Sequence, residues 1–484
     1  LFHSVAQPGS GLYIDQVSAE LVGDLDPARL RSVWRQLVER HPALRTAFLW
    51  DGLDEPVQVV RETVELPWQE EDWRGCDTRE QAAMQVAMLR RDRLLGFALE
   101  QAPLLRMTLA RTGERSWWWL WTFHHLIADG WSTAVLLGEA FKAYAAVEPE
   151  SAVRREAPPY RDYIAWHAGR DFAAAERFWK EQLQGFTEPV RLASLLPQRL
   201  EPGSGVRQRE VQLEAGTTAA LKALAARHRL TLNTVVQGAF ALLLARLTPE
   251  VDIVNGITTS GRPPELPGIE RAVGLFINTL PLRVTVDADA SIVPWLEAIQ
   301  KSQLAVRRFE FSPLAAVQRW SEMGDGQALF ESILVFENYP EGDALLPDDA
   351  PLEVRDLRFD EQSNYPLALL CVPGDRLRLI AIHDPARIGD GVAALCLDLL
   401  PRILEQFATS PGGRLRDIRL DSAVDRQALE AWNATGTEPV EPLCMHEWIA
   451  RTARANGDRL AVIAPDRPLT YAELDAHAKA LAAE

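Results

Sequence analysis

The spacing of apolar and polar positions in the first fifty residues predicts a helix followed by a strand. Between Asp26 and His41 the apolar residues recur at helical spacing and form one stripe, made of Leu30, Val33, Trp34, Leu37 and Val38. Asp26 is suited to cap this helix and Pro27 to occupy its first turn, and Pro42 ends it. The apolar run from Leu44 to Trp50 then indicates a strand.

A second run, residues 116–137, predicts a strand, a short loop and a helix. Trp117–Phe123 is rich in β-forming residues and apolar on both faces, which indicates an interior strand. Ser132 is the expected cap of the helix, whose apolar face comprises Leu136, Leu137, Ala140, Phe141 and Tyr144. Helix, strand and loop signals stay mixed through the first ~170 residues, so we expect an α/β (α+β) fold.

Two polar stretches rich in chain-breaking residues divide the sequence into lobes. The first is Thr187–Arg207, which contains Pro202-Gly203-Ser204-Gly205, and the second is Asp421–Pro442. A C-terminal tail beyond them is too short to fold alone, so we expect it to open a further domain of a longer protein. The expected divisions are an N-terminal lobe at 1–185, a C-terminal lobe at 186–425, a linker at 426–440 and the tail at 441–484.

Composition narrows the class of protein. The 484 residues are 47% hydrophobic, which excludes an intrinsically disordered chain. With 51 basic and 68 acidic side chains the net charge is −17, which argues against a nucleic-acid partner. No apolar run approaches the ~18–20 residues needed to cross a bilayer, so no membrane partner is expected. The four cysteines are far apart and form no zinc-binding motif, which indicates a reducing, cytoplasmic setting.

The loop after the predicted interior strand carries the candidate chemistry: His124, His125, Asp129 and Gly130. Adjacent residues of a strand point to opposite faces, so the two histidines should not reach one substrate atom or one metal ion. We expect one histidine to face a cleft, where its pKa of about 6.5 suits proton transfer, and the other to be held by the structure. Asp129 is expected to pair with an arginine, and Gly130 to permit a backbone geometry that a Cβ would obstruct.

A structural reading of this loop competes with the functional one. A single histidine or aspartate at a strand end commonly serves only the fold, whereas the joint pattern His-His-x-x-x-Asp-Gly favours a site. Neither a Gly-x-Ser-x-Gly nucleophile motif nor a Walker or Gly-x-Gly-x-x-Gly phosphate loop is present. We therefore expect no serine nucleophile of that type and no nucleotide bound by those routes.

The chain resembles the condensation domains of nonribosomal peptide synthetases, within the His-His-x-x-x-Asp-Gly acyltransferases. The resemblance covers residues 1 to about 425, although the first core motif of the family is missing or truncated. The segments that carry it are Arg40–Phe48, His124–Ser132, Tyr160–Trp166 and Val273–Thr279 continuing to Arg283, and more loosely Phe311–Leu314 and Ser363–Leu367.

This resemblance implies a fold and a reaction. The fold would be two lobes, each like chloramphenicol acetyltransferase, in a V shape around a central tunnel. Donor and acceptor peptidyl carrier proteins would approach from opposite ends and present thioesters on 4'-phosphopantetheine arms. The acceptor's α-amine would attack the donor thioester and form a peptide bond. No metal and no intrinsic cofactor is implied.

Roles for individual residues follow from the same resemblance. His125 would be the cleft-facing histidine, His124 its structural neighbour and Asp129 an organiser. Arg283, or failing that Arg45, would pair with Asp129. The Gly130 amide would lie near the reacting groups, and Ser260 in Thr259-Ser260-Gly261-Arg262 would donate to the tetrahedral oxyanion.

The chemical role of His125 is left open between two alternatives. It either removes a proton from the attacking amine or orients that amine by a hydrogen bond. We expect the first, at least in part.

The two ends of the chain suggest its context. Leu1–Gly11 resembles domains that take a donor ending in a D-residue, which would place an epimerisation domain upstream. Leu469–Leu474 resembles the opening of an adenylation domain.

There are four alternatives to this function. Another acyltransferase of the superfamily would form an ester or amide with a soluble acceptor, and a non-catalytic platform would only dock carriers. Epimerising and heterocyclising relatives depart from the motif at Gly130–Ser132 and at the first histidines, respectively.

Overall fold

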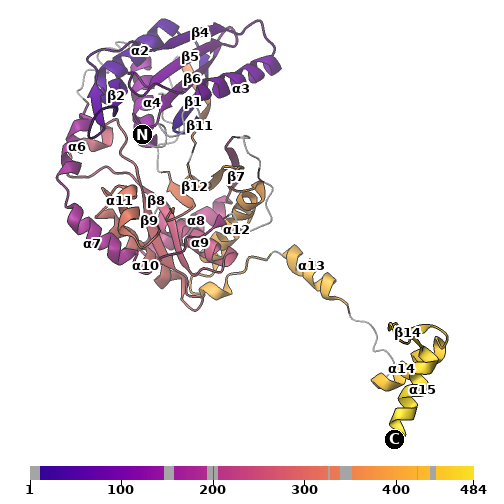
Figure 1. Ribbon diagram of the computed structural model, residues 1–484. Coiled ribbons are helices and arrows are strands. Elements are labelled where there is room, and N and C mark those ends of the chain that lie inside the picture. The colour runs from indigo at the N-terminus through magenta and orange to yellow at the C-terminus, as the bar shows by residue number, and fades with distance from the viewer. Residues whose placement is uncertain are drawn as a thin grey trace. The chain divides into compact units, whose positions relative to one another are not determined.

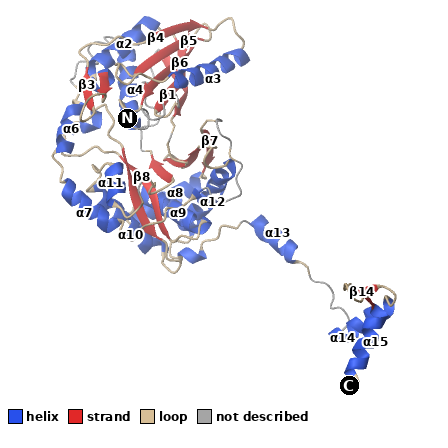
Figure 2. Cartoon of the chain, viewed as in Figure 1, coloured by secondary structure: helices blue, strands red, loops and turns tan. Residues whose placement is uncertain are grey.

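The computed structural model describes residues 11–146, 157–192, 200, 205–324, 327–337, 352–362, 364–421, 423–435 and 443–484. The chain forms two compact units, Leu1–Arg419 and Leu420–Glu484. The larger unit contains two mixed α/β lobes, each built around one sheet (Figures 1 and 2). This arrangement agrees with the expected α/β (α+β) class.

The first lobe is built on a five-stranded sheet in the order β11-β1-β6-β5-β4. β6 lies in the middle and pairs antiparallel with β1 and β5, while β4 runs parallel to β5. The strands are β1 (Ile14–Gly23), β4 (Trp68–Asp72), β5 (Leu105–Arg111), β6 (Ser116–His124) and β11 (Leu352–Asp360). The helices are α2 (Pro27–Arg40), α3 (Thr78–Leu95) and α4 (Gly130–Ala145), and β2 (Thr46–Leu49) pairs separately with β3 (Val57–Val60).

The predicted first helix and interior strand are confirmed. Asp26 caps α2 by accepting from the backbone N–H groups of Ala28 and Arg29, and Pro27 is its first residue. The expected strand at 44–50 starts later, at Thr46, because Pro42–Arg45 forms a 3-10 turn (η1). Ser132 does not cap α4 as expected, because Asp129 takes that place and accepts from the Ser132 N–H.

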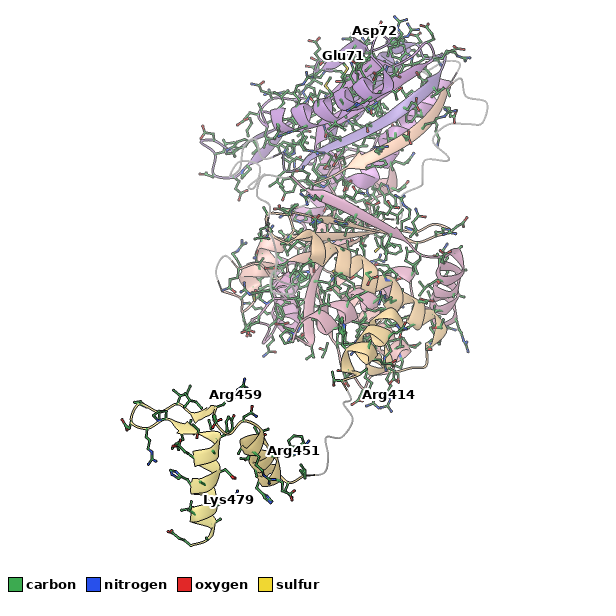
Figure 3. The ribbon with its side chains drawn as sticks, turned by 90° about the vertical axis from the view of Figure 1, so that its right-hand side faces the viewer. Glu71, Asp72, Arg414, Arg451, Arg459 and Lys479 are labelled. Atoms are coloured by element: carbon green, nitrogen blue, oxygen red, sulfur yellow. The ribbon has the colours of Figure 1, made fainter. Side chains whose placement is uncertain are left out.

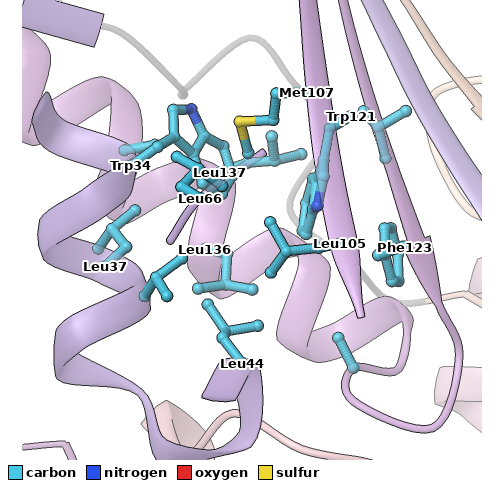
Figure 4. Packing of buried hydrophobic residues seen from close by; sticks show 14 of the residues in the cluster. Trp34, Leu37, Leu44, Leu66, Leu105, Met107, Trp121, Phe123, Leu136 and Leu137 are labelled. Atoms are coloured by element: carbon cyan, nitrogen blue, oxygen red, sulfur yellow. The ribbon is translucent and has the colours of Figure 1, made fainter. Parts of the chain in front are cut away.

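The aromatic run of β6 supplies the core of this lobe on both faces of the sheet. On one face Trp34 of α2 lies against Trp119, with ring centroids 5.7 Å apart. Trp34 also lies against Trp121 on this face, at 4.9 Å (Figure 4). On the other face Trp118 stacks on Trp73 at 5.4 Å. Burial on both faces anchors β6 rigidly, and with it the loop that follows.

The second lobe has a six-stranded sheet in the order β7-β13-β12-β10-β8-β9. Its strands are β7 (Arg207–Gln212), β8 (Asp252–Thr259), β9 (Asn278–Thr285), β10 (Ser332–Phe336), β12 (Leu367–Val372) and β13 (Arg378–His383). Its helices are α8 (Ala215–Arg227), α9 (Leu232–Leu247), α10 (Ile292–Arg307), α11 (Leu314–Trp320) and α12 (Asp390–Thr409), with 3-10 turns η3 (Ile269–Arg271) and η5 (Leu415–Asp417). Helices α6 (Tyr160–Ala168) and α7 (Phe172–Gln182) come between the two lobes in the chain.

The lobe boundaries predicted from the linkers stay predictions, and the structure adds one feature to them. β11 lies at 352–360, inside the range expected for the C-terminal lobe, yet it pairs antiparallel with β1 of the first lobe. Its Leu352 is buried in the first lobe's core. The chain therefore returns to the first sheet after most of the second lobe has been built.

The smaller unit is a short α/β segment. It contains α13 (Ala423–Asn433), α14 (Met445–Ala455), the paired strands β14 (Leu460–Val462) and β15 (Leu469–Thr470), and α15 (Tyr471–Ala482). Arg451, Arg459 and Lys479 are exposed on it (Figure 3).

In the described part of the chain no single helix is long and apolar enough to cross a membrane. The bent pair α8–α9 meets that test only when its two helices are taken together.

Candidate active site

The His-His-x-x-x-Asp-Gly residues connect the central strand of the first lobe to helix α4. His124 is the last residue of β6 and lies opposite Ile14 of β1. Asp129 caps α4, and Gly130 is the first residue of that helix. The loop is therefore fixed at both ends by buried elements.

The two histidines have different surroundings. His124 is 3% exposed, and its Nδ1 accepts the Leu126 N–H at 3.1 Å. Burial lowers the pKa of His124 to about 4, so its ring is neutral near pH 7. The side chain of His125 keeps 25% of its surface exposed, and its backbone N–H donates to the Tyr13 carbonyl at 2.8 Å. Of the two rings, that of His125 is therefore the more exposed.

A buried carboxylate that the sequence analysis missed holds His125. Asp15 Oδ2 lies 2.5 Å from His125 Nδ1, and the Asp15 side chain is only 7% exposed. Burial lowers the pKa of His125, but the charge and hydrogen bond of Asp15, with the charges of Glu361 and Asp129, raise it to about 9. The available signal was an aspartate between the apolar Ile14 and Val17 in a stretch with strand character.

Glu361 acts on this pair through its charge, and Glu337 acts in turn on Glu361. Glu361 follows β11, and Glu337 follows β10. Burial raises the pKa of Glu361 to about 8, and the charges of Asp15 and Glu337 add to this effect. Burial likewise raises the pKa of Glu337 to about 7. Carboxyl groups are therefore concentrated around His125, and the raised pKa of Glu361 keeps it largely protonated near pH 7.

Asp129 connects the first lobe to the second through a buried network. It is 2% exposed, and its Oδ1 accepts from the Ser132 N–H at 2.8 Å and from Arg262 Nη2 at 3.3 Å. Its Oδ2 accepts the backbone N–H groups of Phe276 and Ile277 at 2.9 and 3.2 Å. With both oxygens occupied in this way, Asp129 organises the loop and is not placed to act as a base.

The prediction that Arg283 or Arg45 pairs with Asp129 is wrong, because Arg262 does so. Arg283 pairs with Asp252 at 2.6 Å, and Arg45 donates to backbone carbonyls, including that of Val38 at 3.1 Å.

The strand register explains the error. Arg283 lies inside β9 opposite Val254, five residues from the end where Asn278 meets Thr259. Arg262 follows that end of β8, next to the loop that contains Phe276. The sequence analysis quoted Arg262 only as a neighbour of Ser260.

A cavity of about 370 Å³ brings two of the predicted residues together. Asp129 and Trp131 line it from the first lobe, and Ser260 lines it from the end of β8. Its remaining wall includes Thr231 and Asn233 at the start of α9 and polar residues of α10, among them Gln300, Gln303 and Arg307. His125 is not among its lining residues.

Among the described residues, no group of three or more His, Cys, Asp or Glu side chains is arranged to hold a metal ion. All four cysteines, Cys76, Cys371, Cys396 and Cys444, are unpaired.

Comparisons with known proteins place this site in a family. The family model described as "Condensation domain" matches residues 1–430. The chain is 39% identical over 486 residues to a linear gramicidin synthase protein of Brevibacillus parabrevis, and 31% identical over 489 residues to bacitracin synthase 3 of Bacillus licheniformis. Both matches cover 100% of this chain but only 6% and 8% of the relatives' own length.

Solved structures agree with the fold. A holo four-domain nonribosomal peptide synthetase bound to AMP and glycine matches with a TM-score of 0.75 at 19% identity, over 100% of this chain and 38% of that one. The first condensation domain of the calcium-dependent antibiotic synthetase, in complex with a substrate analogue, matches with a TM-score of 0.69 at 20% identity, over 87% and 97% of the two chains. The fold is thus the paired-lobe, acetyltransferase-like one that the sequence predicted.

Proposed function

The chain belongs to the condensation-domain family of nonribosomal peptide synthetases, and on this basis we propose that it forms a peptide bond between two carrier-bound substrates. The donor is a peptidyl or aminoacyl thioester, and the acceptor is an aminoacyl thioester with a free α-amine. Each is presented on the 4'-phosphopantetheine arm of a peptidyl carrier protein. The observation that carries the proposal is the position of His125. Its ring is partly exposed just after the end of β6, and the buried carboxylate of Asp15 holds it.

The reaction balances without any further reactant. The acceptor's amine nitrogen attacks the thioester carbonyl carbon, so a C–N bond forms and the carbonyl electron pair moves to oxygen. When the tetrahedral intermediate collapses, the C–S bond breaks and the donor's arm leaves as a thiol. One proton passes from the amine nitrogen to sulfur, and the products are an amide and a thiol.

His125 is the group that carries this proton. Because its pKa is raised to about 9, the ring is protonated at neutral pH and donates first, to the sulfur that gains negative charge as the C–S bond breaks. The nitrogen of the intermediate becomes positively charged on attack and returns a proton to the ring. The raised pKa favours this order over direct removal of a proton from the attacking amine.

Other residues of the motif support the loop and the intermediate. Asp129 holds the loop against the second lobe. The Gly130 N–H lies at the positive end of α4, where a developing oxyanion is favoured. Ser260 shares a cavity with Asp129, which supports a role for its hydroxyl in binding the arm or the intermediate.

The context of the chain belongs to the same proposal. A donor ending in a D-residue, and an epimerisation domain upstream, are supported by the resemblance of Leu1–Gly11, of which residues 1–10 lie outside the described part of the chain. A contiguous adenylation domain is supported by the resemblance of Leu469–Leu474. A cytoplasmic location stays a prediction from cysteine usage.

Single-turnover peptide formation tests the main proposal. Both carriers are loaded, and the product on the acceptor carrier is measured by mass spectrometry. His125→Ala is expected to lower the rate by about 100-fold or more. His446→Ala, the same change at an exposed histidine, is the matched control and should keep the wild-type rate. An equal rate in His125→Ala would exclude the role of this ring.

The donor's configuration is tested in the same assay. Donors that differ only in a D- or L-terminal residue are loaded on the upstream carrier. We expect the D form to react faster, and preference for the L form would refute this part of the proposal. An ester product, or transfer to a soluble amine alone, would favour another acyltransferase of the superfamily.

A further inference from the structure

Two contacts tie His125 to strand β1. Its backbone N–H donates to the Tyr13 carbonyl at 2.8 Å, which extends the ladder between β1 and β6 by one residue. Its ring Nδ1 lies 2.5 Å from Asp15 Oδ2, two residues further along β1. Main chain and side chain are therefore held by the same strand, so the ring has little freedom to rotate.

The Asp15 contact determines which ring nitrogen is available. A carboxylate only accepts hydrogen bonds, so Nδ1 of His125 has to carry a hydrogen. Nε2 is then the nitrogen left for the reacting groups, whether the ring is neutral or protonated. The Asp15 side chain is 7% exposed, so water competes little for this bond.

The other ionisable groups around His125 act less strongly on it. Glu361 approaches from the segment after β11, and its own raised pKa keeps it largely neutral near pH 7. Asp129, from the loop before α4, is neutralised by Arg262. His124 is neutral, and Glu337, after β10, acts on Glu361. Asp15 is thus the charged group that directly contacts the ring.

We propose that Asp15 is a positioning residue for peptide-bond formation: it orients the His125 ring and fixes the tautomer that presents Nε2 to the substrates. The effect of Asp15 on the reaction rate rests on the proposed function. The orientation and tautomer of the His125 ring do not. It predicts that Asp15 affects the rate of the chemical step and the titration of His125, and leaves the binding of the loaded carriers unchanged.

The first test is a ¹⁵N NMR titration of the His125 ring in the intact wild-type chain, which needs no variant and no substrate. We expect an inflection near pH 9 and, above it, the tautomer with hydrogen on Nδ1. Asp15→Asn should move the inflection down by at least one pH unit. Asp24→Asn, an exposed aspartate just beyond β1, is the matched control and should leave it unchanged. A wild-type inflection near 6.5, or the same titration in Asp15→Asn, would overturn the inference.

The second test is kinetic. In single-turnover assays Asp15→Asn should lower the maximal rate about 10-fold to 100-fold and leave the half-saturating carrier concentration unchanged. The inflection in the plot of rate against pH should move to lower pH. Asp15→Glu should recover part of the rate, because it restores an accepting carboxylate. An unchanged maximal rate together with a raised half-saturating carrier concentration would contradict a positioning role. If the wild-type chain forms no peptide at all, the proposed function fails, while the NMR titration still decides the role of Asp15.

Discussion

Asp129 shows how one buried carboxylate joins a helix end, a loop and a second lobe. Its two oxygens accept four hydrogen bonds, three from backbone N–H groups and one from Arg262. Arg262 also donates to the Ala272 carbonyl and lies 4.1 Å over the Phe276 ring. Such a pair adds little to stability by itself, but removing one partner leaves an uncompensated charge in the interior.

Truncating Arg262 should therefore destabilise the larger unit. We expect Arg262→Met to lower its free energy of unfolding by about 3–5 kcal/mol, measured by urea denaturation. Adding Asp129→Asn should recover part of that loss, because the remaining buried charge is removed. Arg271→Met, at an exposed arginine of η3, is the control and should change stability by less than about 0.5 kcal/mol. Equal unfolding free energies for Arg262→Met and Arg271→Met would show that the Arg262–Asp129 pair does not stabilise the fold.

The raised pKa of His125 makes stability depend on pH in a defined direction. The folded value of about 9 exceeds the unfolded value of about 6.5, so the protonated ring stabilises the folded state fully below pH 6.5. This contribution is lost as the pH rises from 6.5 to 9. At about 1.4 kcal/mol for each pH unit, the advantage of wild type over His125→Gln should shrink by roughly 3 kcal/mol across that range.

Urea denaturation at several pH values measures this difference. The raised pKa of Glu361 also weakens the fold as the pH rises, and comparing wild type with His125→Gln at the same pH cancels the part of that contribution that does not depend on His125. His446→Gln is the control and should differ from wild type by the same small amount at every pH. A constant difference between His125→Gln and wild type would contradict the strong coupling of His125 to Asp15.

At the scale of elements, the two lobes use the same strand–loop–helix unit. β6 ends at the buried His124 before α4, and β13 ends at the buried His383 before α12. The next residue is His125 in the first lobe and Asp384 in the second. His383 bonds Asp390 at 2.8 Å, so the second unit keeps a structural histidine without a second imidazole beside it.

The turn after β8 places Arg262, and it depends on Gly261. Gly261 has a φ of +60°, and a Cβ there would lie 1.8 Å from the Phe276 carbonyl oxygen. Gly261→Ala should therefore destabilise the unit by several kcal/mol and displace Arg262 from Asp129. Gly138→Ala is the matched control, since Gly138 lies inside α4 with open space around it and alanine there should stabilise by about 0.5–1 kcal/mol. Thermal unfolding measures both variants, and the midpoint temperature should fall for Gly261→Ala and rise for Gly138→Ala.

The structure also shows which parts of the site could be predicted from sequence. Helix α2 and strand β6 follow from local periodicity, because burial repeats at fixed spacing along one element. The partner of Asp129 depends on the backbone of the Gly261 turn, which no periodicity encodes. Asp15 contacts His125 across 110 residues of chain. Its charge within the Ile14–Val17 stretch marks it as unusual, but its partner follows only from the register of β1 with β6.

At the scale of the molecule, the first lobe is completed by a strand from late in the sequence. β11 pairs with β1 from Gln16 to Gly23, and Glu361, which follows it, faces the His125 site. The loop through Phe276 also holds Asp129. The active site is therefore assembled only when distant parts of the chain have folded together, and the first lobe should not be stable without residues 352–360.

A core substitution in β11 tests this dependence. Leu352 is 4% exposed and packs in the first lobe's core, so Leu352→Ala should lower stability by about 2–5 kcal/mol. Phe359→Ala, on the same strand but 47% exposed, is the control and should cost much less. Urea denaturation followed by tryptophan fluorescence is weighted toward the first lobe, because that lobe buries Trp34, Trp73, Trp119 and Trp121. Hydrogen exchange in β1 and β6 should rise with Leu352→Ala. Unchanged hydrogen exchange in β1 and β6 would mean that the first sheet does not depend on β11 for its stability.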